Sequence, residues 1–231
     1  MIQVFKKEFK TYFVSPIAYI VITIFLALSG WFFFSTFFIY NQAELRSFFS
    51  LLPLMFSFFI PAVTMKLFSE EFNTGSYELL LTMPLSTKDV VIGKFLAAEA
   101  FVFIMLLPTI SYGIFISLLG DLDWGTVIGG YVGALFLAAA FSAIGLFASS
   151  LTRNQIIAFI IAMAICFFLT LIDKILFFIP SLLLGLFQFL GADYHFQNIS
   201  RGIVDSRDLL YFVSVCFIML YATTLIVEEK I

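Results

Sequence analysis

The sequence predicts an all-α integral membrane protein with six transmembrane helices, and three observations lead to this prediction. Of the 231 residues, 62% are hydrophobic and 12% are charged, whereas soluble domains are about half apolar and a quarter charged. The mean hydropathy is +1.11. The charged residues also gather between long apolar runs, as they do in membrane proteins. A soluble fold of this length could not bury so much apolar surface.

Six apolar runs are long enough to cross a bilayer, which takes roughly 20 helical residues for ~30 Å of hydrocarbon. They cover residues 17–40, 48–67, 95–119, 126–150, 155–173 and 209–227. An even number of spans places both termini on one side of the membrane. That side carries most of the Lys and Arg residues, and the other carries Arg46, Lys174, Arg201 and Arg207. The positive-inside rule therefore predicts cytoplasmic termini.

The first sixteen residues predict an amphipathic helix that lies in the membrane interface. Val4, Phe5 and Phe9 alternate at helical spacing with lysines. The Ser15-Pro16 pair then separates this helix from the first span. The alternative is a positively charged flank that only orients the first span.

The fourth span carries Gly125, Gly129 and Gly133 at every fourth position. In lipid, such a stripe of small residues lets helix backbones approach closely, so this helix is predicted to be central in the bundle. The sequence leaves open whether its contact lies within the chain or with a second subunit.

After the fifth span, residues 175–208 predict an outer hairpin followed by a loop. The run from Ile175 to Leu190 is apolar, but Pro180 and Gly185 divide it into halves too short to cross. We expect a re-entrant or interfacial helical hairpin shielded by protein. The polar segment from Gly191 to Asp208 then leads into the last span.

Several kinds of chemistry are not expected of this chain. The phosphate-binding pattern G-x-x-x-x-G-K-[ST] is absent, so the chain has no ATPase of its own and binds no cofactor. His195 is the single histidine and has no metal ligand at a suitable spacing. The G-x-S-x-G pattern of hydrolases is absent too. Cys166 and Cys216 lie in apolar runs and read as buried small residues. The small net charge of -3, without a basic patch, excludes nucleic acid as a partner.

Residues 69–84, between the second and third spans, predict a short helix at the membrane surface. Gly75 permits a turn, and Ser76 can cap the helix that follows. Glu78 suits the first turn of that helix, and Pro84 ends it. A short amphipathic helix of this kind fits a groove on a partner protein. From the residues alone, a helix that rests in the interface is an equal alternative.

The same segment resembles a known family. Glu70-Glu71, Gly75-Ser76 and the run from Glu78 to Ser86, closed by Gly93-Lys94, resemble the coupling segment of permease subunits in the type-2 ABC exporter family. Residues 15–19, 60–65, 120–125, 148–155 and 200–208 resemble the gliding-motility-associated permease subunits (GldF) of Bacteroidetes-type bacteria. Ser76 stands where the family often has threonine, and it keeps the capping hydroxyl.

The resemblance implies a permease in the bacterial inner membrane that is part of a dimeric transmembrane unit. A separate ATP-binding subunit would hold ATP and Mg, and a second membrane subunit with a periplasmic region would complete the complex. The complex would drive export or mechanical work. The coupling contacts would come from Glu70, Glu71, Gly75, Ser76, Glu78, Leu79, Leu80 and Pro84. A membrane anchor or scaffold that transports nothing is the main alternative, and an integral membrane enzyme is a third.

Charged residues elsewhere have two interpretations each. Glu70 and Glu71 either pair with a partner or cap a neighbouring helix. Glu99, inside the third span, is a polar contact that moves with the ATPase, or a helix-end carboxylate that reaches headgroups or pairs with a lysine, Lys94 or Lys66. The outer cluster is a docking face for the periplasmic subunit or a solvated loop; it comprises Arg201, Asp205, Arg207 and Asp208.

Overall fold

A computed structural model describes residues 1–40, 44–77, 86–175, 181–203 and 205–230. Within these ranges the chain is helical and contains no strand. Six helical stretches are long and apolar enough to span a membrane: Pro16–Ser35, Arg46–Thr74, Thr87–Ser117, Trp124–Leu151, Gln155–Ile175 and Ser206–Glu229. The predicted fold class, an all-α integral membrane protein, is confirmed.

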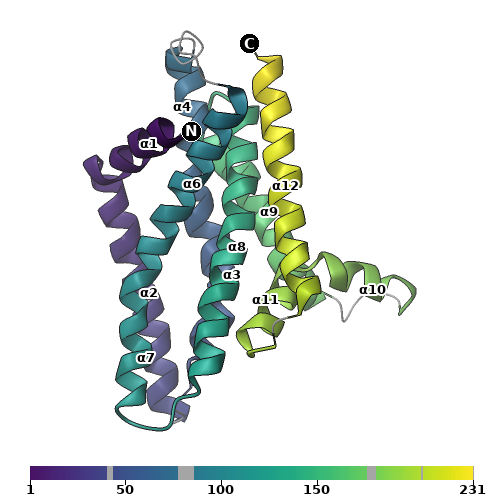
Figure 1. The fold of residues 1–231 in the computed structure, drawn as a ribbon. Coiled ribbons are helices and arrows are strands. Elements are labelled where there is room, and N and C mark those ends of the chain that lie inside the picture. Colours follow the sequence, from purple (N-terminus) through teal and green to yellow (C-terminus); the bar gives the residue numbers. More distant parts are fainter. Residues whose placement is uncertain (41–43, 78–85, 176–180, 204, 231) are drawn as a thin grey trace.

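The described helices form one elongated bundle (Figure 1). In chain order they are α1 (Ile2–Val14), α2 (Pro16–Tyr40), α3 (Arg46–Thr64), α4 (Lys66–Thr74), α6 (Thr87–Leu106), α7 (Ile110–Ser117), α8 (Trp124–Leu151), α9 (Gln155–Ile175), α10 (Ser181–Leu190), α11 (Ala192–Ser200) and α12 (Ser206–Glu229). Figure 1 shows α1, α4 and both chain termini at one end, which we call the terminal end. The α7–α8 loop and the start of α3 lie at the opposite end.

Helix α8 is the centre of the bundle, as its small residues predict. Of its most apolar stretch 72% is buried, against 22% for α2. The glycines of α8 allow this packing. The ring of Phe49 from α3 lies where a Cβ on Gly130 would be, and the Thr64 side chain takes the corresponding place at Gly145. Close approach of backbones through glycine is the expected packing mode in lipid.

Two spans extend further than their apolar runs. The third span begins at Thr87, where Ser86 caps the helix by accepting a hydrogen bond from the Asp89 amide at 3.2 Å. It passes through a 3-10 turn at Leu107–Thr109 and continues as α7. The second span continues into α4 after Met65. Both extensions carry charged residues, so a measure of apolar length does not detect them.

The segment expected as a polar loop, Gly191–Asp208, contains a packed helix instead. Helix α11 lies against α8, and its Phe196 and Ile199 are fully buried. Helix α11 starts directly after Gly191. The carboxylate of Asp173 lies so close to Gly191 that a Cβ at this position would not fit. Helix α10 precedes α11 and extends sideways from the bundle (Figure 1). Residues 176–180 of the expected hairpin lie outside the described residues.

Candidate functional site at the terminal end

Helix α1 packs along α6 through one buried stripe. Val4, Glu8 and Tyr12 stand four residues apart and are the buried residues of this helix. Val4 packs so closely that a Cβ on Gly93 would lie 2.9 Å from its own Cβ. The Tyr12 hydroxyl donates to the Val63 carbonyl of α3 at 3.2 Å, and burial raises the pKa of this phenol. The stripe therefore fixes α1 to both α3 and α6.

An acid on a buried stripe needs a basic partner, and Glu8 has two. Lys94 of α6 is fully buried, and its Nζ lies 3.2 Å from Glu8 Oε1 and 2.9 Å from Glu71 Oε2 of α4. The same ammonium donates to the Leu67 carbonyl at 2.6 Å. Lys7 lies 3.5 Å from Glu8 and 3.4 Å from Glu71. We call these four charged residues, Lys7, Glu8, Glu71 and Lys94, the ion cluster.

The ion cluster balances its own charge. Two ammonium groups face two carboxylates, so Lys94 is buried without a net charge around it. Its ammonium donates hydrogen bonds to Leu67 and Glu8, whereas its contact with Glu71 is an ion pair off the hydrogen-bond direction. For Lys7, partial burial alone would lower the pKa, but Glu8 and Glu71 outweigh this and raise it. Lys94 thus joins α6 to α1 and α4 at once.

A serine of α8 fixes the junction between α3 and α4. The Ser149 hydroxyl donates to the Met65 carbonyl at 2.8 Å and accepts from the amides of Phe68 and Ser69 at 2.9 and 3.0 Å. These amides belong to the first turn of α4, where backbone N–H groups have no partner within the helix. Ser149 therefore satisfies the start of α4 and ties it to the central helix.

The predicted coupling residues lie in different environments. Glu71 is buried in the ion cluster, so it is engaged inside the chain, whereas Glu70 is exposed on the same helix. Gly75 ends α4 with a left-handed φ of 71°. The Ser76 hydroxyl lies 2.9 Å from that of Thr74. Four predicted contacts lie outside the described residues: Glu78, Leu79, Leu80 and Pro84.

A polar groove of about 200 Å³ opens between α1 and α4, and three residues of the ion cluster contribute to its lining. It is lined by Lys7, Glu8, Thr11, Lys66, Leu67, Glu70, Glu71, Thr74 and Ser76. Next to it, the Phe72 ring lies 5.0 Å from that of Tyr77 and under the Lys230 ammonium at 4.5 Å. Lys230 also donates to the Ser150 carbonyl at 2.6 Å, so the end of α12 is joined to the same surface.

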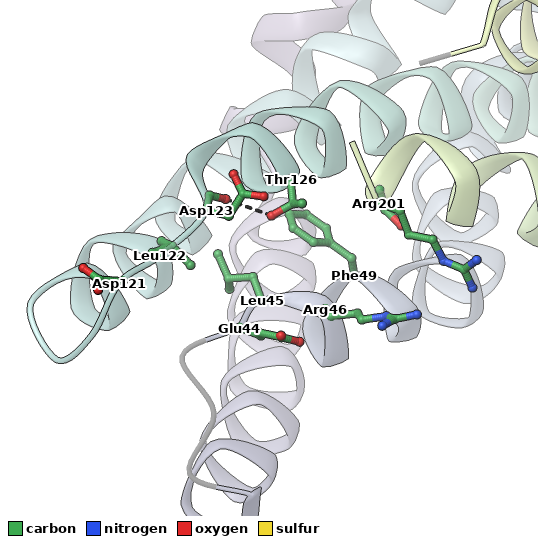
Figure 2. A pocket seen from close by; sticks show the side chains of 10 residues that line it. Glu44, Leu45, Arg46, Phe49, Asp121, Leu122, Asp123, Thr126 and Arg201 are labelled. Carbon is green, nitrogen blue, oxygen red and sulfur yellow. Dashed lines mark hydrogen bonds between the residues drawn. The ribbon is translucent and has the colours of Figure 1, made fainter. Parts of the chain in front are cut away.

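At the opposite end, a recess of about 310 Å³ lies between the starts of α3 and α8 and the end of α11. Figure 2 shows Arg46 and Arg201 extending to one side of it, with Asp121 and Asp123 toward the other. Within the described part of the chain, neither arginine makes a salt bridge. The recess therefore presents charges of both signs.

The four residues of the predicted outer docking face have different environments. Arg201 and Arg207 are exposed. Asp205 caps α12 by accepting from the Arg207 amide at 3.0 Å. Asp208 is not available for a partner, because it is 3% exposed and lies 2.6 Å from His195 Nδ1. The other ring nitrogen of His195 contacts the Phe189 carbonyl at 2.9 Å.

Glu99 is half-buried in α6, and it makes no ion pair with either lysine considered from the sequence. Lys94 is engaged by the ion cluster, and the Lys66 ammonium lies over the Tyr12 ring at 4.9 Å. One carboxylate oxygen of Glu99 is shielded from solvent without a hydrogen-bond partner among the described residues.

The glycine stripe of α8 has its contacts within the chain. A Cβ on Gly129 would lie 2.8 Å from the Ile199 carbonyl, and one on Gly133 would lie 3.1 Å from the Ile199 side chain. Gly125 meets only Asp123, the cap of its own helix. Two members of the stripe thus pack α8 against α11.

A comparison with protein families identifies the chain. The sequence profile of the ABC-2 family transporter proteins matches residues 2–226. The chain belongs to this family. It is therefore a multi-pass membrane permease subunit of an ABC transporter, a type of subunit distinct from the one that hydrolyses ATP. The comparison with curated proteins finds no match.

Reasoning from the sequence missed three parts of this permease: Glu8, the link from Lys94 to Glu71, and the pair of His195 with Asp208. The signal for Glu8 was present, since Glu8 stands four residues from both Val4 and Tyr12 on the apolar stripe. No such signal exists for the other two, because their partners come from different helices.

Proposed function

We propose that this ABC-2 permease couples ATP hydrolysis by a separate subunit to movement of its own helix bundle through the terminal end. The ATP-binding subunit, which carries ATP and Mg, would dock on the surface made by α1, α4 and the segment from Ser76 to Pro84. The observation that carries the proposal is Lys94, since this one buried ammonium connects α1, α4 and α6. Force applied to α4 would therefore reach the third span directly.

The polar groove between α1 and α4 supports the proposed docking. Glu70 and Ser76 both line it, Glu70 is exposed, and Leu79 and Leu80 follow Ser76 in the sequence. A partner helix or loop with basic residues would complement the exposed carboxylate and cover the apolar residues that follow. The excess of Lys and Arg on this side supports cytoplasmic termini and a place in the bacterial inner membrane.

The finer biological role rests on sequence resemblance. The blocks that resemble the GldF permeases support a link to gliding motility, in which the complex would export a substrate or perform mechanical work on periplasmic machinery. A dimeric transmembrane unit and a second membrane subunit with a periplasmic region would complete the complex. At the outer end the exposed Arg201 and Arg207 are the docking contacts that remain, together with the helix cap Asp205.

Co-purification tests the proposal. The permease is co-expressed with the ATP-binding subunit, extracted in detergent, and compared with a Glu70→Lys, Glu78→Lys double variant. We expect the wild type to retain the ATP-binding subunit and the variant to retain about tenfold less, because the reversed charges repel a basic partner surface. Arg207→Glu at the opposite end is the matched control and should leave retention unchanged.

A second variant separates docking from coupling. The double variant Leu79→Ala, Leu80→Ala should lower the amount of export or mechanical work obtained per ATP hydrolysed, while the chain remains folded. Wild-type binding and wild-type activity in this variant would refute the role of the segment. A wild-type chain that purifies without any ATP-binding subunit would favour the scaffold alternative.

A further inference from the structure

His195 is buried where three helices meet. It is 2% exposed and stands on α11, which contacts both α10 and α12 (Figure 1). Its Nδ1 lies 2.6 Å from Asp208 Oδ1 of α12, and its Nε2 lies 2.9 Å from the Phe189 carbonyl oxygen of α10. Both ring nitrogens therefore face an oxygen atom at hydrogen-bonding distance.

These two contacts need two protons. A carbonyl oxygen and an ionised carboxylate only accept hydrogen bonds, whereas a neutral imidazole has a single N–H to donate. With a neutral ring and an ionised Asp208, one nitrogen lone pair would face an oxygen lone pair. A second proton removes this repulsion. It belongs on the ring rather than on Asp208, because an unperturbed histidine binds a proton up to about pH 6.5 and an aspartate only up to about pH 3.9.

Few charged residues come from the helices that pack against α11, which are α3, α8, α9, α10 and α12. Helices α8 and α10 contain none, and α3 has Arg46 alone, exposed at its first residue. Helix α9 supplies Asp173 and Lys174 near its end. At the start of α12, Asp208 is buried and Arg207 is exposed.

The charges that surround the ring favour the second proton. On α11 itself, Asp193 is buried and pairs with Lys174 at 3.5 Å. Asp173 accepts a hydrogen bond from the Tyr194 amide at 2.7 Å. With Asp208, three carboxylates and one ammonium of the described residues lie around His195. Negative charge nearby favours the charged form of a histidine, so the imidazolium reduces an excess of negative charge.

The ring holds the end of α10 in place. Phe189 belongs to the last turn of α10, where carbonyl groups have no partner within the helix. His195 supplies a donor to this carbonyl, and the Tyr211 hydroxyl donates to the next one, that of Leu190, at 2.7 Å. The Tyr211 ring also stacks on His195 at 4.2 Å. A neutral ring would keep one of its two hydrogen bonds and lose the other.

We propose that His195 and Asp208 form a proton-dependent latch, in which an imidazolium holds the end of α10 against α11 and α12. When the pH rises, the second proton leaves to solvent and the end of α10 loosens. Above about pH 6.5 a histidine in the unfolded chain is largely neutral, so the latched state then binds more protons than the unfolded state. The stabilisation is therefore complete at lower pH and decreases as the pH rises.

Nitrogen NMR tests the protonation state, because His195 is the single histidine of the chain. The chain is labelled with ¹⁵N-histidine and purified without a histidine tag. At about pH 7.5, where an unperturbed histidine is largely neutral, we expect both ring nitrogens to be protonated. Asp208→Asn should give a neutral ring at this pH, since an amide can donate to the unprotonated nitrogen. Asp205→Asn, in an exposed cap nearby, is the matched control and should keep the imidazolium.

Hydrogen exchange tests the effect on α10. From about pH 6 to about pH 9, protection of the last turn of α10 should fall about tenfold or more in the wild type, as expected for the loss of one charge-assisted hydrogen bond. Protection in α6 should stay the same, and Asp208→Asn should remove the dependence on pH.

Three results would overturn the latch: an unprotonated ring nitrogen in the wild type at about pH 7.5, an imidazolium that persists in Asp208→Asn, or α10 protection that does not change with pH. The wild-type spectrum decides the first of these even if the variant fails to fold. His195 lies outside the proposed coupling contacts, so failure of the latch would leave the coupling proposal standing.

Discussion

At the residue scale, Lys94 decides how the terminal end is built. A buried ammonium is costly unless it is paired and hydrogen-bonded. Lys94 is paired with Glu8 and Glu71 and donates to the Leu67 carbonyl. Its contacts therefore join α6 to α1 and α4 at once. A buried ion pair adds little net stability over an apolar core, but it strongly disfavours any arrangement that leaves one member alone.

Replacing Lys94 should therefore destabilise the chain strongly. Lys94→Met removes the positive charge and leaves Glu8 and Glu71 buried with Lys7 as their one ionic partner among the described residues. We expect a loss of roughly 3–5 kcal/mol in the free energy of unfolding, measured by thermal or denaturant unfolding in detergent. Lys6→Met, an exposed lysine of α1, is the control and should change stability little. Adding Glu71→Gln to Lys94→Met should restore part of the loss. Equal stability of Lys94→Met and wild type would contradict this account.

His195 also joins several helices, away from the terminal end. It connects Asp208 of α12 to the end of α10, and its ring stacks on Tyr211 at 4.2 Å. We expect His195→Leu to weaken the packing of α10 and α11 by about 1.5–3 kcal/mol, because Asp208 would lose a charge-assisted partner. Hydrogen exchange should then become faster in α11 and remain unchanged in α6. Faster exchange throughout the chain, or no change in exchange anywhere, would argue against a local role of His195.

At the element scale, the contact of α8 with α11 depends on glycine. A methyl group on Gly129 meets a backbone carbonyl, which cannot rotate away. Gly129→Ala should therefore cost about 1–3 kcal/mol through overpacking, read as a lower unfolding midpoint. Gly125→Ala belongs to the same stripe but meets only Asp123. It should have a smaller effect, and equal effects at the two positions would refute the packing argument.

The elements differ in how well their sequence predicts them. The apolar run and Pro16 predict the first span closely, since α2 begins at Pro16 and ends at Tyr40. The start of α6 was not predictable from hydropathy, because its first turns carry Lys88 and Asp89. Helix α11 was missed for a related reason: Asp193 and His195 make it look solvent-exposed. Both are buried, and each has a polar partner from another helix or its own.

At the scale of the whole molecule, the sequence predicts the fold class, the six spans and the central place of α8, and the structure confirms them. It does not predict which charges meet. Glu8, Glu71 and Lys94 are far apart in the chain and come together only when α1, α4 and α6 pack. From the sequence, Glu71 was a candidate for pairing with a partner protein, because nothing in its local pattern shows that it is buried.

The whole terminal end is joined by these contacts. Helix α1 is fixed to α6 and α3, α4 is fixed to α8 by Ser149, and α12 is fixed by Lys230. If an ATP-binding subunit docks there, we expect the terminal end to move as one body relative to the opposite end. Such rigid-body motion about packed interfaces is a common way in which small local changes become large ones.

The most direct test is a pair of spin-label distances in the complex with the ATP-binding subunit, after replacement of Cys166 and Cys216 by serine. One pair joins Gln3 of α1 to Asn73 of α4, which is exposed and is not one of the proposed coupling contacts, and the other joins Asn73 to Arg207 at the start of α12. On adding ATP, we predict that the Gln3–Asn73 distance stays the same while the Asn73–Arg207 distance changes. A change in the first distance, or no change in the second, would contradict the proposal that the ion cluster transmits motion from the terminal end to the bundle.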